Sequence, residues 1–141
     1  MPFVLDCSVT MAWVFPDEAN ETTDALREAL VDDVAVVPVL WPIEVGNVLL
    51  VAARRGRIAP QDWLRVRDDL DALPIEIDPE SGERVLDSVL PAAYEHKLSV
   101  YDAMYFELAH RMRLPLATLD DGLVAACKAA GVEVICGTRD G

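Results

Sequence analysis

The stretch Phe3-Val4-Leu5-Asp6 is a short apolar run that ends in a carboxylate. A second run, Val34-Ala-Val-Val37, is entirely apolar, rich in β-branched residues and ended by Pro38. Runs of this length and composition are typical of strands that are buried on both faces of a parallel sheet. Because ligands of such sheets bind beyond the carboxyl ends of the strands, Asp6 is the first candidate for a functional residue.

Helical patterns separate further apolar runs along the rest of the chain. Pro42 and Pro60 suit the first turn of a helix, and Gly56 and Gly131 are placed to end one. The predicted strands span residues 3–6, 34–37, 74–77, 116–119 and 132–135, and the predicted helices span 8–15, 21–30, 42–55, 60–72, 80–96, 99–112 and 121–130. Strands that alternate with helices need crossover connections, so we expect a mostly parallel central sheet in an α/β/α sandwich.

The length of 141 residues predicts one domain that spans residues 1–141, and 52% hydrophobic and 26% charged residues are globular values. No apolar run approaches the roughly 18 residues that a membrane span needs, so we expect a cytoplasmic protein without a membrane segment. Cys7, Cys127 and Cys136 form no C-x-x-C pair and have no histidine cluster nearby. We therefore expect reduced, mostly buried thiols in place of a zinc site or a disulfide framework.

The formal net charge of −13 argues against a nucleic-acid-binding protein, because proteins that bind phosphates usually carry an excess of basic residues. The basic residues nevertheless include two compact groups, Arg54-Arg55-Gly-Arg57 and His110-Arg111-Met-Arg113. Each group falls at the end of a predicted helix, where cations complement the helix dipole. Contact with RNA phosphates is the alternative role for these groups, and the strongly acidic balance also suits a basic protein partner.

Four acidic residues stand at the edges of apolar segments: Asp6, Glu44, Asp102 and Asp120. Three of them have a structural explanation on their own. Asp6 could cap the helix that follows it, and Glu44 lies in a first helical turn, where negative charge is favoured. Asp102 follows Ser99 in the S-x-x-acid pattern of a capping box. Each signal alone is therefore weak.

The same capping pattern recurs at Thr118-Leu-Asp-Asp121, with Thr118 as the cap and Asp121 as the reciprocal acid. This interpretation leaves Asp120 without a structural role. Carboxylates that converge repel one another and raise their pKa values unless a cation lies between them. Mg²⁺ and Mn²⁺ prefer such oxygen ligands, and a bound ion lowers the pKa of its water and neutralises charge on a phosphodiester.

Histidine general-base chemistry has little support in this chain. His96 and His110 are its only histidines, and neither has an obvious partner. Hydrolysis by a metal-activated water needs no such base. The four carboxylates therefore favour a metal-dependent nuclease that uses Mg²⁺ or Mn²⁺.

Four segments, in this order and spacing, resemble the PIN-domain family: Met-Pro-Phe-Val-Leu-Asp6-Cys-Ser8-Val, Pro42-Ile-Glu44-Val-Gly-Asn47-Val-Leu-Leu, Leu98-Ser-Val-Tyr-Asp102-Ala and Leu116-Ala-Thr118-Leu-Asp120-Asp-Gly-Leu123. The resemblance covers nearly the whole chain and is greatest to the VapC-type toxins of toxin–antitoxin pairs. It implies an α/β/α sandwich and an endoribonuclease whose Mg²⁺ or Mn²⁺ ligands are Asp6, Glu44, Asp102 and Asp120. It also implies a homodimer that a cognate antitoxin silences.

The resemblance assigns supporting roles to four further residues. Ser8 and Thr118 match positions where family members carry small polar residues, so we expect them to orient a carboxylate or a water. Asn47 lies one turn after Glu44, on the same side of the helix, where it could contact substrate. Asp121 could serve as an outer acid next to Asp120, although a capping role explains it better.

Apolar residues suggest partner surfaces, each with a plainer explanation in core packing. Met11, Trp13, Val14 and Phe15 could line the groove of an antitoxin, but they equally suit a helix that covers the sheet. The helix after Pro42 is apolar almost all round, so part of it could form a dimer face. Trp63, Tyr101, Tyr105 and Phe106 fit the core better than a base-stacking platform.

Three other functions are open at this point. Asp6-Cys-Ser-Val-Thr10 is similar to the D-x-D-x-T/V motif of haloacid-dehalogenase-like phosphatases, but Ser8 replaces the second acid. A catalytically inactive PIN-like module could keep its carboxylates for structure and bind protein partners. DNA is the third alternative, because metal-assisted phosphodiester hydrolysis does not itself select the sugar.

Overall fold

The computed structural model of this protein describes residues 1–135, so Cys136 and the end of the expected domain lie outside the described residues. The described strands form one five-stranded parallel sheet in the order β3-β2-β1-β4-β5. They are β1 (Phe3–Leu5), β2 (Ala35–Pro38), β3 (Ile75–Asp78), β4 (Leu116–Ala117) and β5 (Val134–Ile135). The prediction of a mostly parallel sheet is confirmed.

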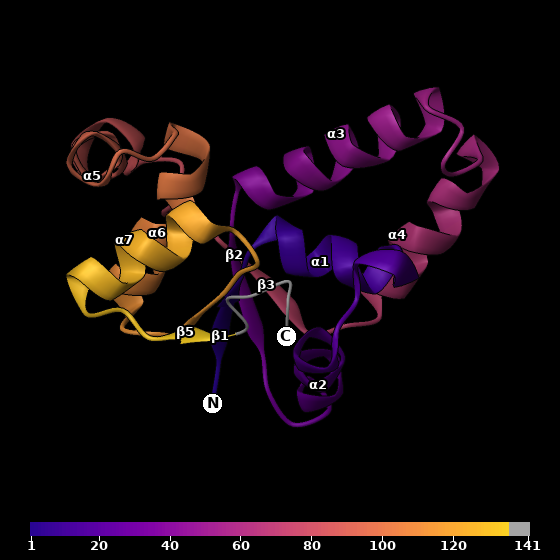
Figure 1. The fold of residues 1–141 in the computed structure, drawn as a ribbon, viewed down its shortest axis with the longest axis horizontal. Helices are drawn as coiled ribbons and strands as arrows, with labels where there is room; N and C mark the ends of the chain where they lie inside the picture. The colour runs from indigo at the N-terminus through magenta and orange to yellow at the C-terminus, as the bar shows by residue number, and fades with distance from the viewer. Residues whose placement is uncertain (136–141) are drawn as a thin grey trace.

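Seven α-helices of the described residues connect and cover the strands. They are α1 (Cys7–Val14), α2 (Glu21–Ala29), α3 (Leu40–Arg54), α4 (Trp63–Asp71), α5 (Leu90–His96), α6 (Val100–Met112) and α7 (Asp121–Ala130). Figure 1 shows α5, α6 and α7 on one side of the sheet and α1, α2 and α4 on the other, with α3 above α1. The chain therefore folds as the expected α/β/α sandwich. Among the described residues, no helix is both long and apolar enough to cross a bilayer.

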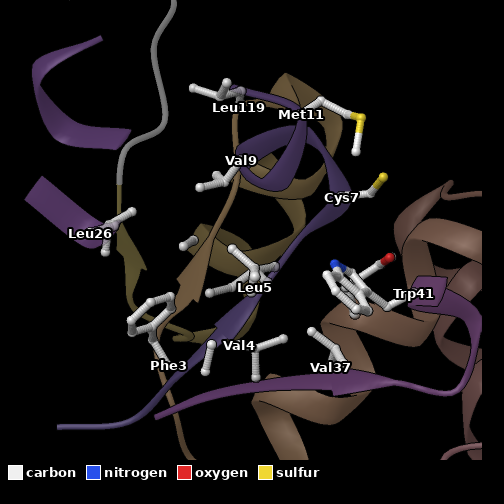
Figure 2. Close-up of a cluster of buried hydrophobic side chains, with 14 of the residues drawn as sticks. Phe3, Val4, Leu5, Cys7, Val9, Met11, Leu26, Val37, Trp41 and Leu119 are labelled. Carbon is white, nitrogen blue, oxygen red and sulfur yellow. The ribbon is translucent and has the colours of Figure 1, made fainter. Parts of the chain in front are cut away.

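The central strands are buried because their side chains are apolar on both faces of the sheet. Val4 and Leu5 are fully buried, and Val4 pairs with Val36 of β2 and with Leu116 of β4. Figure 2 shows β1 and β2 side chains packed with residues of α1 and with Trp41. This packing holds the carboxyl end of β1 in the middle of the sheet.

The prediction of one helix over residues 80–96 is wrong. Residues 79–84 form turns, a π-helical segment spans Val85–Val89, and the α-helix begins at Leu90. Ser81 is buried and anchors the turns, because its Oγ donates to the Asp78 carbonyl and accepts from the Val39 amide, both at 2.8 Å. Pro91 contributes no backbone donor, which also works against a continuous helix through this region.

Other predicted boundaries differ by a few residues. The helix expected from residue 60 opens as a 3₁₀ turn at Pro60–Asp62, and α3 begins two residues before Pro42. The strands expected at 116–119 and 132–135 are shorter, Leu116–Ala117 and Val134–Ile135. Leu119 leaves the sheet because its amide donates to Ser8 Oγ at the site described next, whereas the Thr118 amide still donates to the Ile135 carbonyl of β5.

Candidate functional site

The candidate site lies at the carboxyl ends of β1 and β4, which are neighbours in the centre of the sheet. The chain continues from β1 toward β2 on one side and from β4 toward β5 on the other, so the strand order reverses between them. Open α/β sheets bind ligands at this switch point. Asp6 directly follows β1 and Asp120 follows β4, so both lie at the edge where a site is expected.

Asp6 is held by two hydroxyl groups. It is 5% exposed, and its Oδ2 accepts from Ser8 Oγ at 2.6 Å and from Thr118 Oγ1 at 2.8 Å. Asp6 occupies the N-cap position of α1 but makes no side-chain capping bond there. The capping explanation for its carboxylate is therefore wrong, and the carboxylate is directed to the site.

The two hydroxyls also hold the loop that leads to Asp120. Ser8 Oγ accepts from the Leu119 amide, and Thr118 Oγ1 accepts from the Asp120 amide, each at 3.0 Å. Because these backbone donors occupy lone pairs of the hydroxyls, the hydroxyl protons are free to point at Asp6. Ser8 and Thr118 therefore position two candidate ligands at once.

Asp120 has a structural role that the sequence interpretation had given to other residues. Its Oδ2 accepts from the Leu123 amide at 2.9 Å and so caps α7, whereas Thr118 lies outside that helix and bonds Asp6. The prediction of a Thr118–Asp121 capping box is wrong. Asp121 is exposed in the first turn of α7.

Glu44 and Asp102 reach the site from two helices. Glu44 lies near the start of α3, and its Oε1 accepts from the Tyr105 hydroxyl at 2.5 Å. Asp102 lies in the first turn of α6, where its amide donates to Ser99 Oγ at 3.0 Å, so the predicted Ser99 cap is confirmed. Sequence reasoning assigned Tyr105 only to the core and missed its contact with Glu44. The only signal was its position three residues after Asp102, on the same face of the helix.

The electrostatics link the four carboxylates of Asp6, Glu44, Asp102 and Asp120, which we call the acid cluster. Burial, and then the charges of Glu44 and Asp120, raise the pKa of Asp6 to about 6 against the lowering effect of its two hydroxyl partners. Burial and the charges of Asp120 and Asp6 raise the pKa of Asp102 to about 6. Burial raises the pKa of Glu44, the Tyr105 bond lowers it, and Asp102 raises it again.

The donor set of the acid cluster fits a hydrated divalent ion. Among residues 1–135, no three Asp, Glu, His or Cys side chains stand close enough together to enclose one ion directly. Mg²⁺ usually keeps several waters and takes only one or two carboxylates directly, so such enclosure is not needed. Burial and nearby acids hold the pKa of the Cys7 thiol far above its usual range, which keeps this neighbour protonated. The chemistry available is therefore that of carboxylate oxygens and water.

Other residues expected at the site take no part in the hydrogen bonds that join Asp6, Ser8, Thr118 and the Asp120 loop. Asn47 is exposed on α3, one turn after Glu44. A cavity of about 540 Å³ lies between α5, α6 and α7, and both histidines line it, but no member of the acid cluster does. The acid cluster therefore lies apart from this cavity.

The two basic groups are partly explained by ion pairs. Arg111 donates to Glu107 at 2.8 Å and to Asp78 at 2.6 Å, and Arg57 bonds Asp17 and lies over the Phe15 ring. Arg54, Arg55 and Arg113 are exposed at helix ends, as the dipole explanation requires.

A family model described as the PIN domain matches residues 3–129. The chain therefore belongs to the PIN-domain family. Ribonuclease VapC1 of Mycobacterium tuberculosis is 33% identical over 126 residues, which cover 86% of this chain and 90% of that protein. Ribonuclease VapC3 of Pyrobaculum aerophilum is 30% identical over 121 residues, which cover 85% of this chain and 90% of that protein. The resemblance to VapC-type proteins is confirmed.

Solved structures share the fold. PAE2754 from Pyrobaculum aerophilum aligns with a TM-score of 0.67 and 27% identity over 95% of this chain and 92% of that one. VapBC2 from Rickettsia felis, solved with a DNA fragment from its promoter, aligns with a TM-score of 0.63 over 95% of this chain and 97% of that one. Its identity of 8% supports the fold alone.

Proposed function

We propose that this chain is a divalent-metal-dependent endoribonuclease and the toxin of a toxin–antitoxin pair. The observation that carries the proposal is the position of Asp6, which Ser8 and Thr118 fix at the switch point of the sheet. The charges of Glu44 and Asp120 act on Asp6 there, and Asp102 is coupled to both aspartates. Membership of the PIN-domain family and relatives named ribonucleases support RNA as the substrate.

The acid cluster would hold Mg²⁺ or Mn²⁺ through Asp6, Glu44, Asp102 and Asp120. A bound ion supplies an activated water and neutralises charge on the phosphate. Hydrolysis joins the water oxygen to phosphorus and breaks one phosphorus–oxygen bond to a neighbouring sugar, whose oxygen takes the proton. The carboxylates orient this centre, while Ser8 and Thr118 keep Asp6 and the Asp120 loop in register. Asn47 is exposed beside Glu44, where we place a contact to RNA, and Asp121 is a candidate outer acid.

A cognate antitoxin is part of the same proposal, because the chain is similar to ribonucleases of the VapC type. Of the four apolar residues expected to line an antitoxin groove, Met11 and Phe15 are buried in the core and cannot contact a partner. Trp13 and Val14 are half-buried and line a small cavity between α1, α2 and α4. These two residues are the part of the cluster that we propose an antitoxin contacts.

A homodimer is supported by the apolar surface of α3 and α4. Ile43, Leu50 and Leu64 are exposed by 67%, 37% and 62%. Cavities of about 220 and 370 Å³ lie between the two helices, and Leu49 lines both. Leu49, Leu50 and Leu64 line the second of these cavities together, and exposed apolar surface of this kind supports contact with a second copy of the chain. A cytoplasmic location completes the proposal and is supported by the free thiols of Cys7 and Cys127.

The test is cleavage of total RNA, transfer RNA included, by the purified partner-free protein in Mg²⁺ or Mn²⁺. Discrete fragments are expected, and they should disappear with EDTA and in Asp102→Asn. Asp24→Asn is the matched control, because Asp24 is an exposed acid in the first turn of α2. Cleavage that survives EDTA would overturn the metal-dependent mechanism.

The inactive binding module is the second candidate, because no three potential ligands of the described residues enclose an ion directly. A calorimetric Mn²⁺ titration separates the two functions. Binding that Asp102→Asn abolishes supports the nuclease, whereas no binding to the wild-type protein supports the module. The phosphatase alternative is disfavoured, because Asp6 is nearly buried and two hydroxyls hold its Oδ2.

A further inference from the structure

We infer that Tyr105 is a positioning residue that holds Glu44 in place within the acid cluster. The inference rests on the proposed metal-dependent function and adds a residue that the four acidic segments do not contain. Its basis is a 2.5 Å hydrogen bond from the Tyr105 hydroxyl to Glu44 Oε1. A bond of this length to a carboxylate belongs to the strong, charge-assisted class.

The position of Tyr105 connects two helices that each supply a member of the acid cluster. Tyr105 lies on α6 three residues after Asp102, so both side chains project from neighbouring positions on that helix. Glu44 lies on α3, which follows a different strand. The hydroxyl of Tyr105 therefore ties the Glu44 carboxylate on α3 to the helix that carries Asp102.

Burial makes this contact specific. Tyr105 is 0% exposed, so its ring cannot rotate into solvent and its hydroxyl needs a partner inside the protein. Glu44 has a long side chain with several rotamers, and fixing it opposite Asp102 costs conformational entropy. A buried donor that selects one rotamer before the ion arrives removes part of this cost at the binding step. Tyr105 acts on the proposed site through Glu44, the member of the acid cluster to which its hydroxyl donates.

Ring packing and hydroxyl positioning make different predictions. Tyr105→Phe keeps the buried ring and removes only the donor. Tyr101 provides the matched control, because it lies on the same helix but is 62% exposed, so the expectation that it packs in the core is wrong. A role in packing alone would leave metal affinity unchanged in Tyr105→Phe. A positioning role would weaken metal affinity in this variant and not in Tyr101→Phe.

The experiment is calorimetric titration of Mn²⁺ into the 141-residue protein and its variants. We expect Tyr105→Phe to weaken Mn²⁺ binding roughly 10- to 100-fold, as removal of a residue that orients a ligand commonly does, and Tyr101→Phe to bind like the wild type. In a Glu44→Ala background, Tyr105→Phe should add no further loss, because the two residues act as one unit. Wild-type affinity in Tyr105→Phe, or an equal loss with and without Glu44, would overturn the inference.

A spectroscopic measurement keeps the inference testable if Tyr105→Phe folds poorly. The chain has three tyrosines, so ¹³Cζ-tyrosine labelling gives three NMR signals, and Tyr94→Phe and Tyr101→Phe assign the third to Tyr105. Glu44→Ala should shift the Tyr105 signal alone. An unshifted Tyr105 signal would contradict the contact, while a wild-type protein that neither binds Mn²⁺ nor cuts RNA would overturn the proposed function itself.

Discussion

Thr118 Oγ1 donates to Asp6 Oδ2 at 2.8 Å across 112 positions of sequence, and both side chains are buried. The same hydroxyl accepts from the Asp120 amide. One buried oxygen therefore fixes the carboxyl end of β1 against the loop after β4. The two central strands hold the candidate metal ligands in register through this contact.

Thr118→Val should lower both stability and activity. Valine has nearly the shape of threonine, but it leaves the Asp120 amide and the Asp6 carboxylate short of a partner. An unsatisfied buried polar group costs about 1–3 kcal/mol, which urea unfolding would measure. Thr22→Val is the control, because Thr22 is exposed on α2 and should change stability by less than about 0.5 kcal/mol. Equal effects of the two substitutions would show that the hydroxyl of Thr118 has no special role.

The metal-free protein should lose stability as the pH rises from about 4 to above 6. The pKa of Asp6 is about 6 in the folded protein against an ordinary value of 3.8, so the folded state binds this proton more tightly. Its stabilising effect is present below pH 4 and disappears through pH 6, a change of about 3 kcal/mol. Urea unfolding in EDTA across this range measures it. Asp6→Asn cannot titrate at this position and should make the profile shallower, while Asp102, whose pKa is also about 6, keeps part of the slope. An unchanged profile in that variant would contradict the assignment.

Divalent metal should stabilise the protein at neutral pH and EDTA should reverse the effect. An ion that binds only the folded state adds about 2.7 kcal/mol at a concentration 100 times its Kd. Thermal unfolding with and without Mn²⁺ would detect this as a rise in Tm. Asp102→Asn should abolish the rise without destabilising the metal-free protein, because it removes a half-buried charge that Asp120 and Asp6 disfavour. Asp24→Asn should retain the full rise. A rise that persists in Asp102→Asn would remove this residue from the ligand set.

Gly122→Ala should weaken metal binding more than it changes stability. A Cβ at this position would lie 3.2 Å from Asp120 Oδ2, the oxygen that caps α7, so the carboxylate must shift. Alanine favours the helix by about 1 kcal/mol over glycine, which offsets part of the strain. Mn²⁺ titration and urea unfolding together separate the two effects. Gly46→Ala is the control, because an added Cβ there meets nothing within 4 Å, and a similar loss of affinity in it would exclude the steric explanation.

Local sequence patterns were sufficient to predict most helices and strands, because the apolar pattern of a segment reflects which of its faces must be buried. The apolar β1 and β2 segments can only be stable when covered on both faces, which is why a parallel sandwich follows from them. Local patterns gave the wrong prediction for residues 80–96, where one continuous helix was expected. The turns in this segment are held by Ser81 bonds to residues 78 and 39, and the second of these is distant in sequence.

In the candidate site, too, local patterns predicted some features and distant contacts decided others. Asp6 and Asp120 could be placed at strand ends from the sequence, and Ser99 could be identified as a cap. The sequence could not show that Asp120, and not Thr118, caps α7, because both residues suit an N-cap and only the fold brings Asp6 beside Thr118. Tyr105 looked like a core residue, and it is one, but its hydroxyl meets Glu44 only after α3 and α6 come together.

The sequence by itself determined the class of fold, the order of the elements and the set of acidic residues, because hydrophobic period and helix signals are local properties of the chain. Tertiary structure alone decided which carboxylates influence one another and which hydroxyls hold them. Those relationships depend on contacts across 61 and 112 positions, which exist only once the strands are paired and the helices are packed. Burial then gives them their chemical effect, since it raises the pKa of Asp6 and Asp102 to about 6.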